Sequence, residues 1–112
     1  MTELKEKITT HRQFIGGEFV EAASGELLDV LNPATGQVIG RVPASGPEDV
    51  DRAVRAAAKA FETWQHSTPQ DRSLMLLKLA ETIEAHAEEL GRLESANAGK
   101  PVGAAIDEMR TA

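Results

Sequence analysis

The stretch NPATGQVIGRVPASGPEDVDRAV, residues 32–54, contains the change of period that decides the fold class. From Val38 to Val42 apolar residues alternate with others, which is the two-residue period of a β-strand. From Val50 onward apolar residues recur at steps of three and four, which is the period of an α-helix. Between the two lies a helix start with a capping serine, a first-turn proline and an acidic capping-box residue: Ser45, Pro47 and Glu48. The sequence therefore predicts a mixed α/β chain with strands before helices.

Two N-terminal β-hairpins are predicted around glycine-containing turns. In residues 14–20 two apolar pairs flank Gly16-Gly17, and glycine takes the positive φ angles that a tight turn requires. In residues 27–43 two alternating segments flank the turn NPATG, where proline fixes φ and the last glycine suits a left-handed angle. Residues 1–12 are polar and are expected to form a flexible N-terminal tail.

Amphipathic helices are predicted over about residues 47–65 and 69–97. The apolar spacing of the second helix allows a bend near His86. Their apolar stripes are Val50, Val54, Ala57, Phe61 and Trp64 in the first helix, and Leu76, Ala80, Ile83, Ala87 and Leu90 in the second. Gly99 is a typical C-cap, and the spacing after Pro101 predicts the start of a third helix. Residues 13–112 are thus expected to form one α/β region.

Composition excludes several classes of protein. The 112 residues fit one small domain, and 41% apolar with 27% charged residues is a globular composition. A net charge of −6 without a Lys/Arg run argues against nucleic acid and anionic membranes as partners. The chain lacks a run of the roughly 20 apolar residues that a membrane span needs, and the first residues lack a signal-peptide core. A cytoplasmic location is therefore expected.

No catalytic, cofactor-binding or metal-binding residue is predicted in this chain. The sequence contains no cysteine, so it offers no thiolate nucleophile, disulfide or cysteine metal ligand. The histidines, at 11, 66 and 86, are scattered and interpreted as loop or surface residues. The acidic residues of the helices are assigned to first turns or solvated faces: Glu48, Asp49, Asp51, Glu88 and Glu89. Trp64 is assigned to core packing.

Two nucleotide-binding patterns are absent from the sequence. Gly99-Lys100 is followed by proline rather than Ser or Thr, and Glu94 stands where a P-loop needs glycine. The dinucleotide fingerprint G-x-G-x-x-G does not occur. The glycines at 16, 17, 36 and 40 are therefore interpreted as turn and strand glycines.

The order of several short motifs nevertheless resembles the start of an NAD(P)-dependent aldehyde dehydrogenase. These motifs are FIGGEF at 14–19, NPATG at 32–36, DVDRAV at 49–54, Phe61 with Trp64, and LES at 93–95 followed by GKP at 99–101. The resemblance covers about residues 13–112. The segment LESANAGKP is most similar to the aminoaldehyde branch of the family, which includes aminobutyraldehyde and betaine aldehyde dehydrogenases.

The resemblance implies that this chain is a truncated N-terminal piece of a Rossmann-like fold, because family members are several times longer. It implies a full-length homo-oligomer that oxidises aldehydes with NAD or NADP. The catalytic cysteine and glutamate and the main nucleotide contacts would lie beyond Ala112. Some members bind a monovalent cation at positions matching Val30, Leu31 and Asn97, although Asn97 by itself is explained as a residue that ends its helix.

Two hypotheses follow. In the first, the chain is the N-terminal part of an aldehyde-oxidising enzyme, is inactive alone and binds no cofactor alone. In the second, it is a free-standing module that binds an aldehyde dehydrogenase subunit or another protein through its apolar helix faces. In the first, uncovered apolar stripes are expected to make the isolated chain loosely packed and self-associating, whereas a monodisperse monomer would favour the second.

Overall fold

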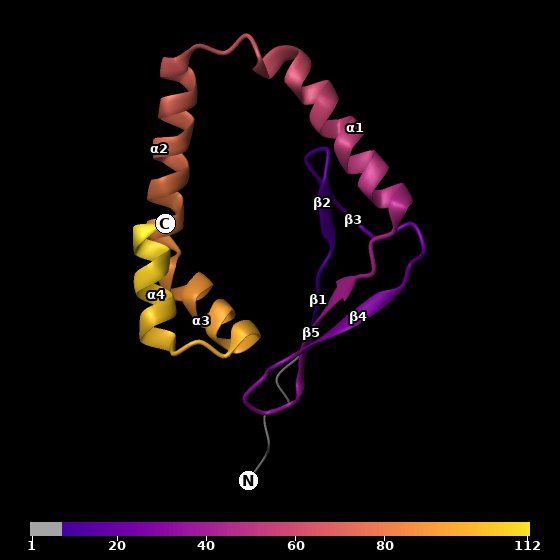
Figure 1. Cartoon of the computed structure of the whole chain (residues 1–112), viewed down its shortest axis with the longest axis vertical. Helices are drawn as coiled ribbons and strands as arrows, with labels where there is room; N and C mark the ends of the chain where they lie inside the picture. Colours follow the sequence, from indigo (N-terminus) through magenta and orange to yellow (C-terminus); the bar gives the residue numbers. More distant parts are fainter. Residues whose placement is uncertain (1–7) are drawn as a thin grey trace. The chain divides into compact units, whose positions relative to one another are not determined.

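The computed structural model describes residues 8–112, which divide into two compact units (Figure 1). The first unit comprises residues 8–31 and 37–65, and it contains the strands and helix α1. The second unit comprises residues 32–36 and 66–112, and it contains helices α2, α3 and α4. The predicted α/β class, with hairpins before helices, is confirmed.

The first unit contains a three-stranded sheet in the order β1-β5-β4. Strand β4 (Leu27–Leu31) pairs antiparallel with β5 (Val38–Pro43), so that Leu28 lies opposite Val42, as the predicted hairpin over 27–43 requires. The connecting turn forms as its sequence predicts. The Asn32 side chain accepts a hydrogen bond from the Ala34 amide at 2.9 Å, and Gly36 has φ of 72°.

Strand β1 (Thr9–Thr10) extends the sheet by pairing parallel to β5. The His11 amide then donates a hydrogen bond to the Arg41 carbonyl at 2.8 Å. The sequence placed these residues in a flexible tail, whereas here they belong to the sheet. Two polar threonines carry no apolar alternation, so the periodicity gave no sign of this strand. The rest of the predicted tail, residues 1–7, lies outside the described residues.

The second hairpin is built from β2 (Gln13–Ile15) and β3 (Glu18–Val20). Gly16 and Gly17 have φ angles of 63° and 86°, which confirms the predicted glycine turn. Phe14 and Phe19 lie opposite each other, with ring centroids 5.1 Å apart in an edge-to-face arrangement. Both rings remain more than half exposed.

Helix α1 (Pro47–Trp64) confirms the predicted helix, but its cap is different. Gly46 is the N-cap, and the Asp49 carboxylate accepts a hydrogen bond from the Gly46 amide at 2.9 Å. Ser45 does not cap the helix, because its hydroxyl donates a hydrogen bond to Oε1 of Gln13 at 2.7 Å. A glycine-initiated helix thus replaces the predicted Ser45–Glu48 capping box.

The predicted helix over 69–97 is divided at His86 into α2 (Pro69–Ala85) and α3 (Ala87–Ala98). His86 has φ −109° and ψ 15°, outside the helical region, and its ring Nδ1 lies 2.8 Å from the Thr82 carbonyl oxygen at the end of α2. Helix α3 ends at Gly99, whose φ of 75° confirms the predicted C-cap. Helix α4 (Val102–Thr111) confirms the predicted third helix.

The break at His86 lets α3 pack closely on α4 through small residues. The buried residues of these two helices are small: Ala87 and Gly91 in α3, and Ala105 in α4. A Cβ atom built on Gly91 would lie 2.6 Å from Cγ1 of Ile106 and 2.7 Å from its Cα. Glycine is therefore required for this helix separation, because ordinary carbon contacts are about 3.5–4.0 Å.

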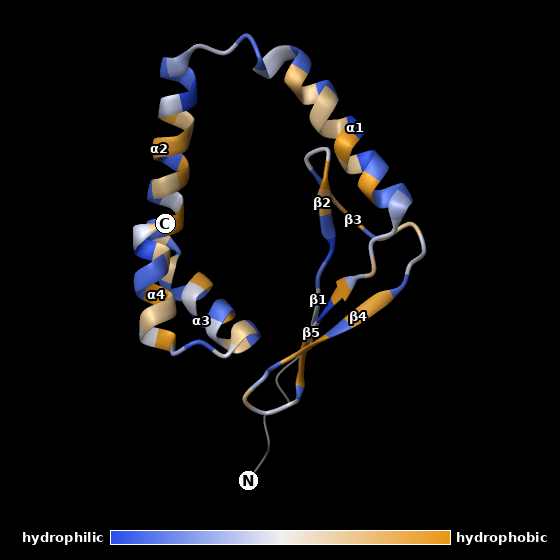
Figure 2. Ribbon diagram, viewed as in Figure 1, coloured by the Kyte–Doolittle hydropathy of each residue, from blue (hydrophilic) through white to orange (hydrophobic). Residues whose placement is uncertain are grey.

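The apolar core of the described residues is small. Ala22, Ala87 and Ala105 are the buried apolar side chains, and Asp49 is the largest fully buried side chain. Large apolar residues of α1 and α2 instead have exposed side chains. Figure 2 shows apolar positions along both helices. Each unit thus has ordered secondary structure with little enclosed apolar volume.

Candidate functional site

Asp49 is the most enclosed charged side chain of the described residues, with 1% of its surface exposed. Its carboxylate accepts hydrogen bonds from the Gly46 amide, the Ala23 amide and the Gln13 side chain at 2.8–2.9 Å. The Gly46 amide, and then Gln13 and Ala23, lower the pKa of Asp49 below its ordinary value of 3.8. The sequence assigned Asp49 to a helix first turn or a solvated face, and it does lie in the first turn of α1, but it is buried rather than solvated. It joins α1 to β2 and to the loop after β3, and a carboxylate so engaged is structural rather than a general base.

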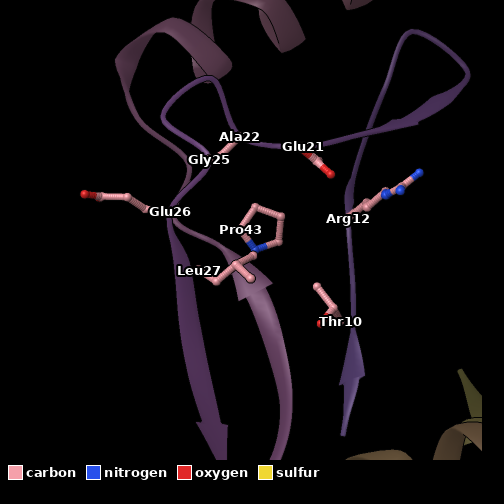
Figure 3. A pocket seen from close by; sticks show the side chains of 8 residues that line it. All are labelled: Thr10, Arg12, Glu21, Ala22, Gly25, Glu26, Leu27 and Pro43. Carbon is pink, nitrogen blue, oxygen red and sulfur yellow. The ribbon is translucent and has the colours of Figure 1, made fainter.

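A cavity of about 200 Å³ lies beside the sheet of the first unit (Figure 3). Its lining residues are Thr10, Arg12, Glu21, Ala22, Gly25, Glu26, Leu27 and Pro43. In Figure 3 the charged ends of Arg12 and Glu26 point away from the centre of the cavity, where the ring of Pro43 lies. Because the charged ends of Arg12 and Glu26 point in opposite directions, they do not meet at a common point in the cavity.

The second unit brings together the two turns that carry most of the sequence resemblance. A Cβ atom on Gly99 would lie 3.0 Å from Cγ of Pro33, so the GKP turn packs directly on the NPATG turn. The Ser95 hydroxyl donates a hydrogen bond to the Lys100 carbonyl oxygen at 2.7 Å. The hydrogen bond that Lys100 donates to Glu108 raises the pKa of this lysine, which keeps its ammonium charged. Lys100 is thus a structural cation and not a nucleophile.

Acidic and histidine side chains do not cluster as metal ligands in the described part of the chain. Within residues 8–112, the side chains of His, Asp and Glu nowhere gather in a group of three that could hold a metal ion. Val30 and Leu31 lie in strand β4, and Asn97 lies in the last turn of α3. The implied cation site at these three residues stays a prediction.

The N-termini of helices α1 and α2 do not fit the pyrophosphate of a nicotinamide cofactor. Such a group needs free backbone amides at a helix start. At α1 the Gly46 amide is hydrogen-bonded to Asp49, and at α2 the Thr68 amide is hydrogen-bonded to Asp71 at 3.3 Å. A carboxylate at each of these positions would repel a phosphate.

The remaining prominent feature is an extensive apolar surface. In the first unit the residues more than half exposed are Phe14, Phe19, Leu28, Leu31, Val50, Val54 and Phe61. In the second they are Leu74, Met75, Leu76, Leu77, Leu79 and Leu93. None of the helices in the described part of the chain has both the length and the apolar content needed to cross a membrane. Both units thus present broad apolar surfaces to solvent.

Comparison with known proteins gives the class. A family model described as "Aldehyde dehydrogenase family" matches residues 19–112. Malonate-semialdehyde dehydrogenase 2 of Geobacillus kaustophilus is 41% identical over 103 residues, which are 92% of this chain and 21% of that protein. The chain belongs to the aldehyde dehydrogenase family, as its sequence motifs predicted.

Solved structures agree with this assignment and with the fold. An NAD-dependent aldehyde dehydrogenase from Sinorhizobium meliloti matches with a TM-score of 0.88 and 35% identity, over 94% of this chain and 22% of that one. A betaine aldehyde dehydrogenase variant from Staphylococcus aureus, solved in complex with NAD+, matches with a TM-score of 0.84 and 37% identity, over 88% of this chain and 20% of that one. This chain spans about a fifth of the length of the relatives it matches.

Proposed function

We propose that this chain is the N-terminal structural part of an enzyme that oxidises aldehydes to carboxylic acids with NAD+ or NADP+. The observation that carries the proposal is the family match over residues 19–112, which includes both the NPATG and the GKP turns. The packing of Gly99 on Pro33 supports it, since the two turns are adjacent in space although far apart in sequence.

In this proposal the chain supplies scaffold and no reacting group. The sequence has no cysteine to attack an aldehyde, and the carboxylate of Asp49 and the ammonium of Lys100 are engaged in internal hydrogen bonds. The nucleophile, the cofactor contacts and the subunit interface of a homo-oligomer would all come from the rest of the enzyme. The chain alone is expected to form no NADH from any aldehyde.

The proposed substrate class is an aminoaldehyde such as 4-aminobutyraldehyde. The sequence LESANAGKP supports this class, and so does the similarity to a betaine aldehyde dehydrogenase, whose name gives a quaternary ammonium aldehyde as substrate. The test uses the enzyme that co-purifies with the tagged chain from its own cells, assayed with 4-aminobutyraldehyde and with butanal. Equal or higher kcat/KM for butanal would reject the aminoaldehyde class. Fractionation of the same cells tests the proposed cytoplasmic location.

The scaffold role is tested with a chimera in which this chain replaces the matching N-terminal segment of the Sinorhizobium meliloti enzyme. The expected result is a folded protein that forms NADH from an aldehyde, at a rate within about tenfold of the parent, because no reacting group is exchanged. A chimera that folds, binds NAD+ and yet oxidises no aldehyde accepted by the parent would overturn the proposal. That result would favour a free-standing interaction module.

A further inference from the structure

The strongest unexplained feature of the molecule is the helix break at His86. Figure 1 shows α3 turning away from the line of α2 at this point. Residues 70–90 contain neither glycine nor proline, and alanine and glutamate, which are strong helix formers, stand on both sides of the break. The local sequence therefore favours a helix that continues through His86.

The apolar period also continues through the break without a change of phase. Steps of four and three separate the apolar residues Leu76, Ala80, Ile83, Ala87 and Leu90. A straight helix would place all five on one stripe. In the structure this stripe is divided, because Leu76 is 65% exposed whereas Ala87 is buried. The chain thus carries the pattern of a straight helix that its broken form does not use.

Side-chain hydrogen bonds, rather than residue types that end helices, accompany the break. The ring Nδ1 of His86 lies 2.8 Å from the carbonyl oxygen of Thr82 and donates to it, because a carbonyl oxygen can only accept. The Thr82 hydroxyl donates in turn to the Lys78 carbonyl oxygen at 2.8 Å. Side chains that bond to the backbone one turn earlier bend a helix. Both side chains are exposed, so water competes with these bonds.

The helices on the two sides of the break are held unequally. Within Pro69–Ala85 the structure buries no side chain, so α2 is only lightly packed. Helices α3 and α4, by contrast, meet at backbone distance around Gly91 and Ile106. The turn between them is fixed by its residue types, since Gly99 has a left-handed φ and Pro101 has a restricted one. Helices α3 and α4 thus form a rigid hairpin whose connection to α2 is weak.

We propose that His86 is a hinge about which the α3–α4 hairpin moves as one body. In the second state of this hinge, α2 and α3 continue as a single straight helix over residues 69–98, and the divided apolar stripe becomes one uninterrupted face. The hinge belongs to the second unit alone and does not depend on the proposed function. It gives this unit two arrangements that differ at one residue, which is the bistable element that a conformational switch requires.

The absence of cysteine allows pairs of spin labels to be placed in the full chain at introduced thiols. The pair Gln70→Cys with Asn97→Cys spans the hinge, and both residues are exposed. In a straight helix they lie about 40 Å apart, at a rise of roughly 1.5 Å per residue, and in the broken form they are closer. Double electron–electron resonance measures this distance, and dilution with unlabelled chain restricts it to labels within one molecule.

The substitution His86→Ala removes the ring hydrogen bond and supplies a stronger helix former. The ratio of the long to the short distance is expected to rise at least about fivefold, because the broken form loses one side-chain hydrogen bond. His66→Ala is the matched control, since His66 lies between α1 and α2 and outside the hinge, and it is expected to leave the ratio unchanged.

A second label pair, Leu93→Cys with Asp107→Cys, reports on the α3–α4 hairpin, and its distance is expected to be the same in the parent and in His86→Ala. A single short distance across the hinge in both proteins would overturn the hinge. A broadened distance within the hairpin would overturn its movement as one body, since α3 and α4 would then have separated. Loss of helix content in His86→Ala, measured by far-UV circular dichroism, would indicate unfolding instead of straightening and would also reject the proposal.

Discussion

The substitution Gly91→Ala tests the packing of the second unit most sharply. Gly91 lies in α3 against Ile106 of α4, and an added Cβ would come within 2.7 Å of three atoms of Ile106, namely Cγ1, Cα and the backbone nitrogen. Two of these atoms belong to the backbone, so a change of rotamer cannot relieve the overlap. The helices must separate by about 1 Å to restore an ordinary contact distance.

The expected magnitude follows from two opposing effects. Overpacking costs about 1–3 kcal/mol, and the backbone neighbours place this case near 3 kcal/mol. Replacing a helical glycine with alanine gains up to about 1 kcal/mol in helix propensity. The net expected loss is about 2 kcal/mol in the free energy of opening the α3–α4 contact.

Amide hydrogen exchange measured by NMR reports this local free energy directly. A loss of about 2 kcal/mol corresponds to roughly 30-fold faster exchange, since each 1.4 kcal/mol is a factor of about ten. The amide of Ala105, which is hydrogen-bonded to the Pro101 carbonyl at 3.0 Å, is a suitable reporter. Gly103→Ala is the matched control in α4, because a Cβ there meets nothing within 4 Å, and it is expected to slow exchange. Exchange that is equal in the two variants would refute the close-packing argument.

Three further predictions concern the turns, the buried carboxylate and the isolated chain. Gly99→Ala and Gly36→Ala are each expected to lower the free energy of unfolding by about 1–2 kcal/mol, because both glycines have left-handed φ angles. The loss is expected to be larger at Gly99, because only its added Cβ would press on Pro33, at 3.0 Å. Equal losses in urea unfolding would contradict this. Because the pKa of Asp49 is lowered on folding, its contribution to stability is present above the ordinary value of 3.8 and is lost as pH falls through the depressed folded value. Asp49→Asn is therefore expected to lower the free energy of unfolding at neutral pH and to make it depend less on acid than in the parent. Asp51→Asn is the control, since Asp51 forms an exposed ion pair, and it is expected to change stability little. Identical acid titrations of the parent and of Asp49→Asn would exclude the Asp49 carboxylate as the cause of the acid dependence. The isolated chain is expected to bind ANS and to elute as an associated species, and a sharp melt from a monodisperse monomer would reject this expectation.

Most of the secondary structure could be predicted because local signals and final structure agree. The glycine turn at 16–17, the NPATG turn and the Gly99 cap each depend on backbone angles that the residue type itself favours. The apolar period located the two hairpins and three of the helices. The predicted helix start was wrong where a tertiary contact intervened. The Ser45 hydroxyl donates its hydrogen bond to Gln13, so that Gly46 and not Ser45 is the N-cap of α1.

The less predictable features depend on contacts distant in sequence. The burial of Asp49 requires β2 and the loop at Ala23 to meet the start of α1, and a single acidic residue in a first turn gives no sign of this. The close approach at Gly91 likewise depends on Ile106, fifteen positions further along.

The most direct test of the central claim is to reassemble the enzyme from two chains. The part of the Sinorhizobium meliloti enzyme beyond its match to this chain is produced with and without this chain, and the rate of NADH formation from an aldehyde is measured. The account predicts no activity from either part alone, and activity that rises with the concentration of this chain and then saturates. A stable complex of the two parts that remains inactive, or activity of the larger part that is indifferent to this chain, would contradict the claim.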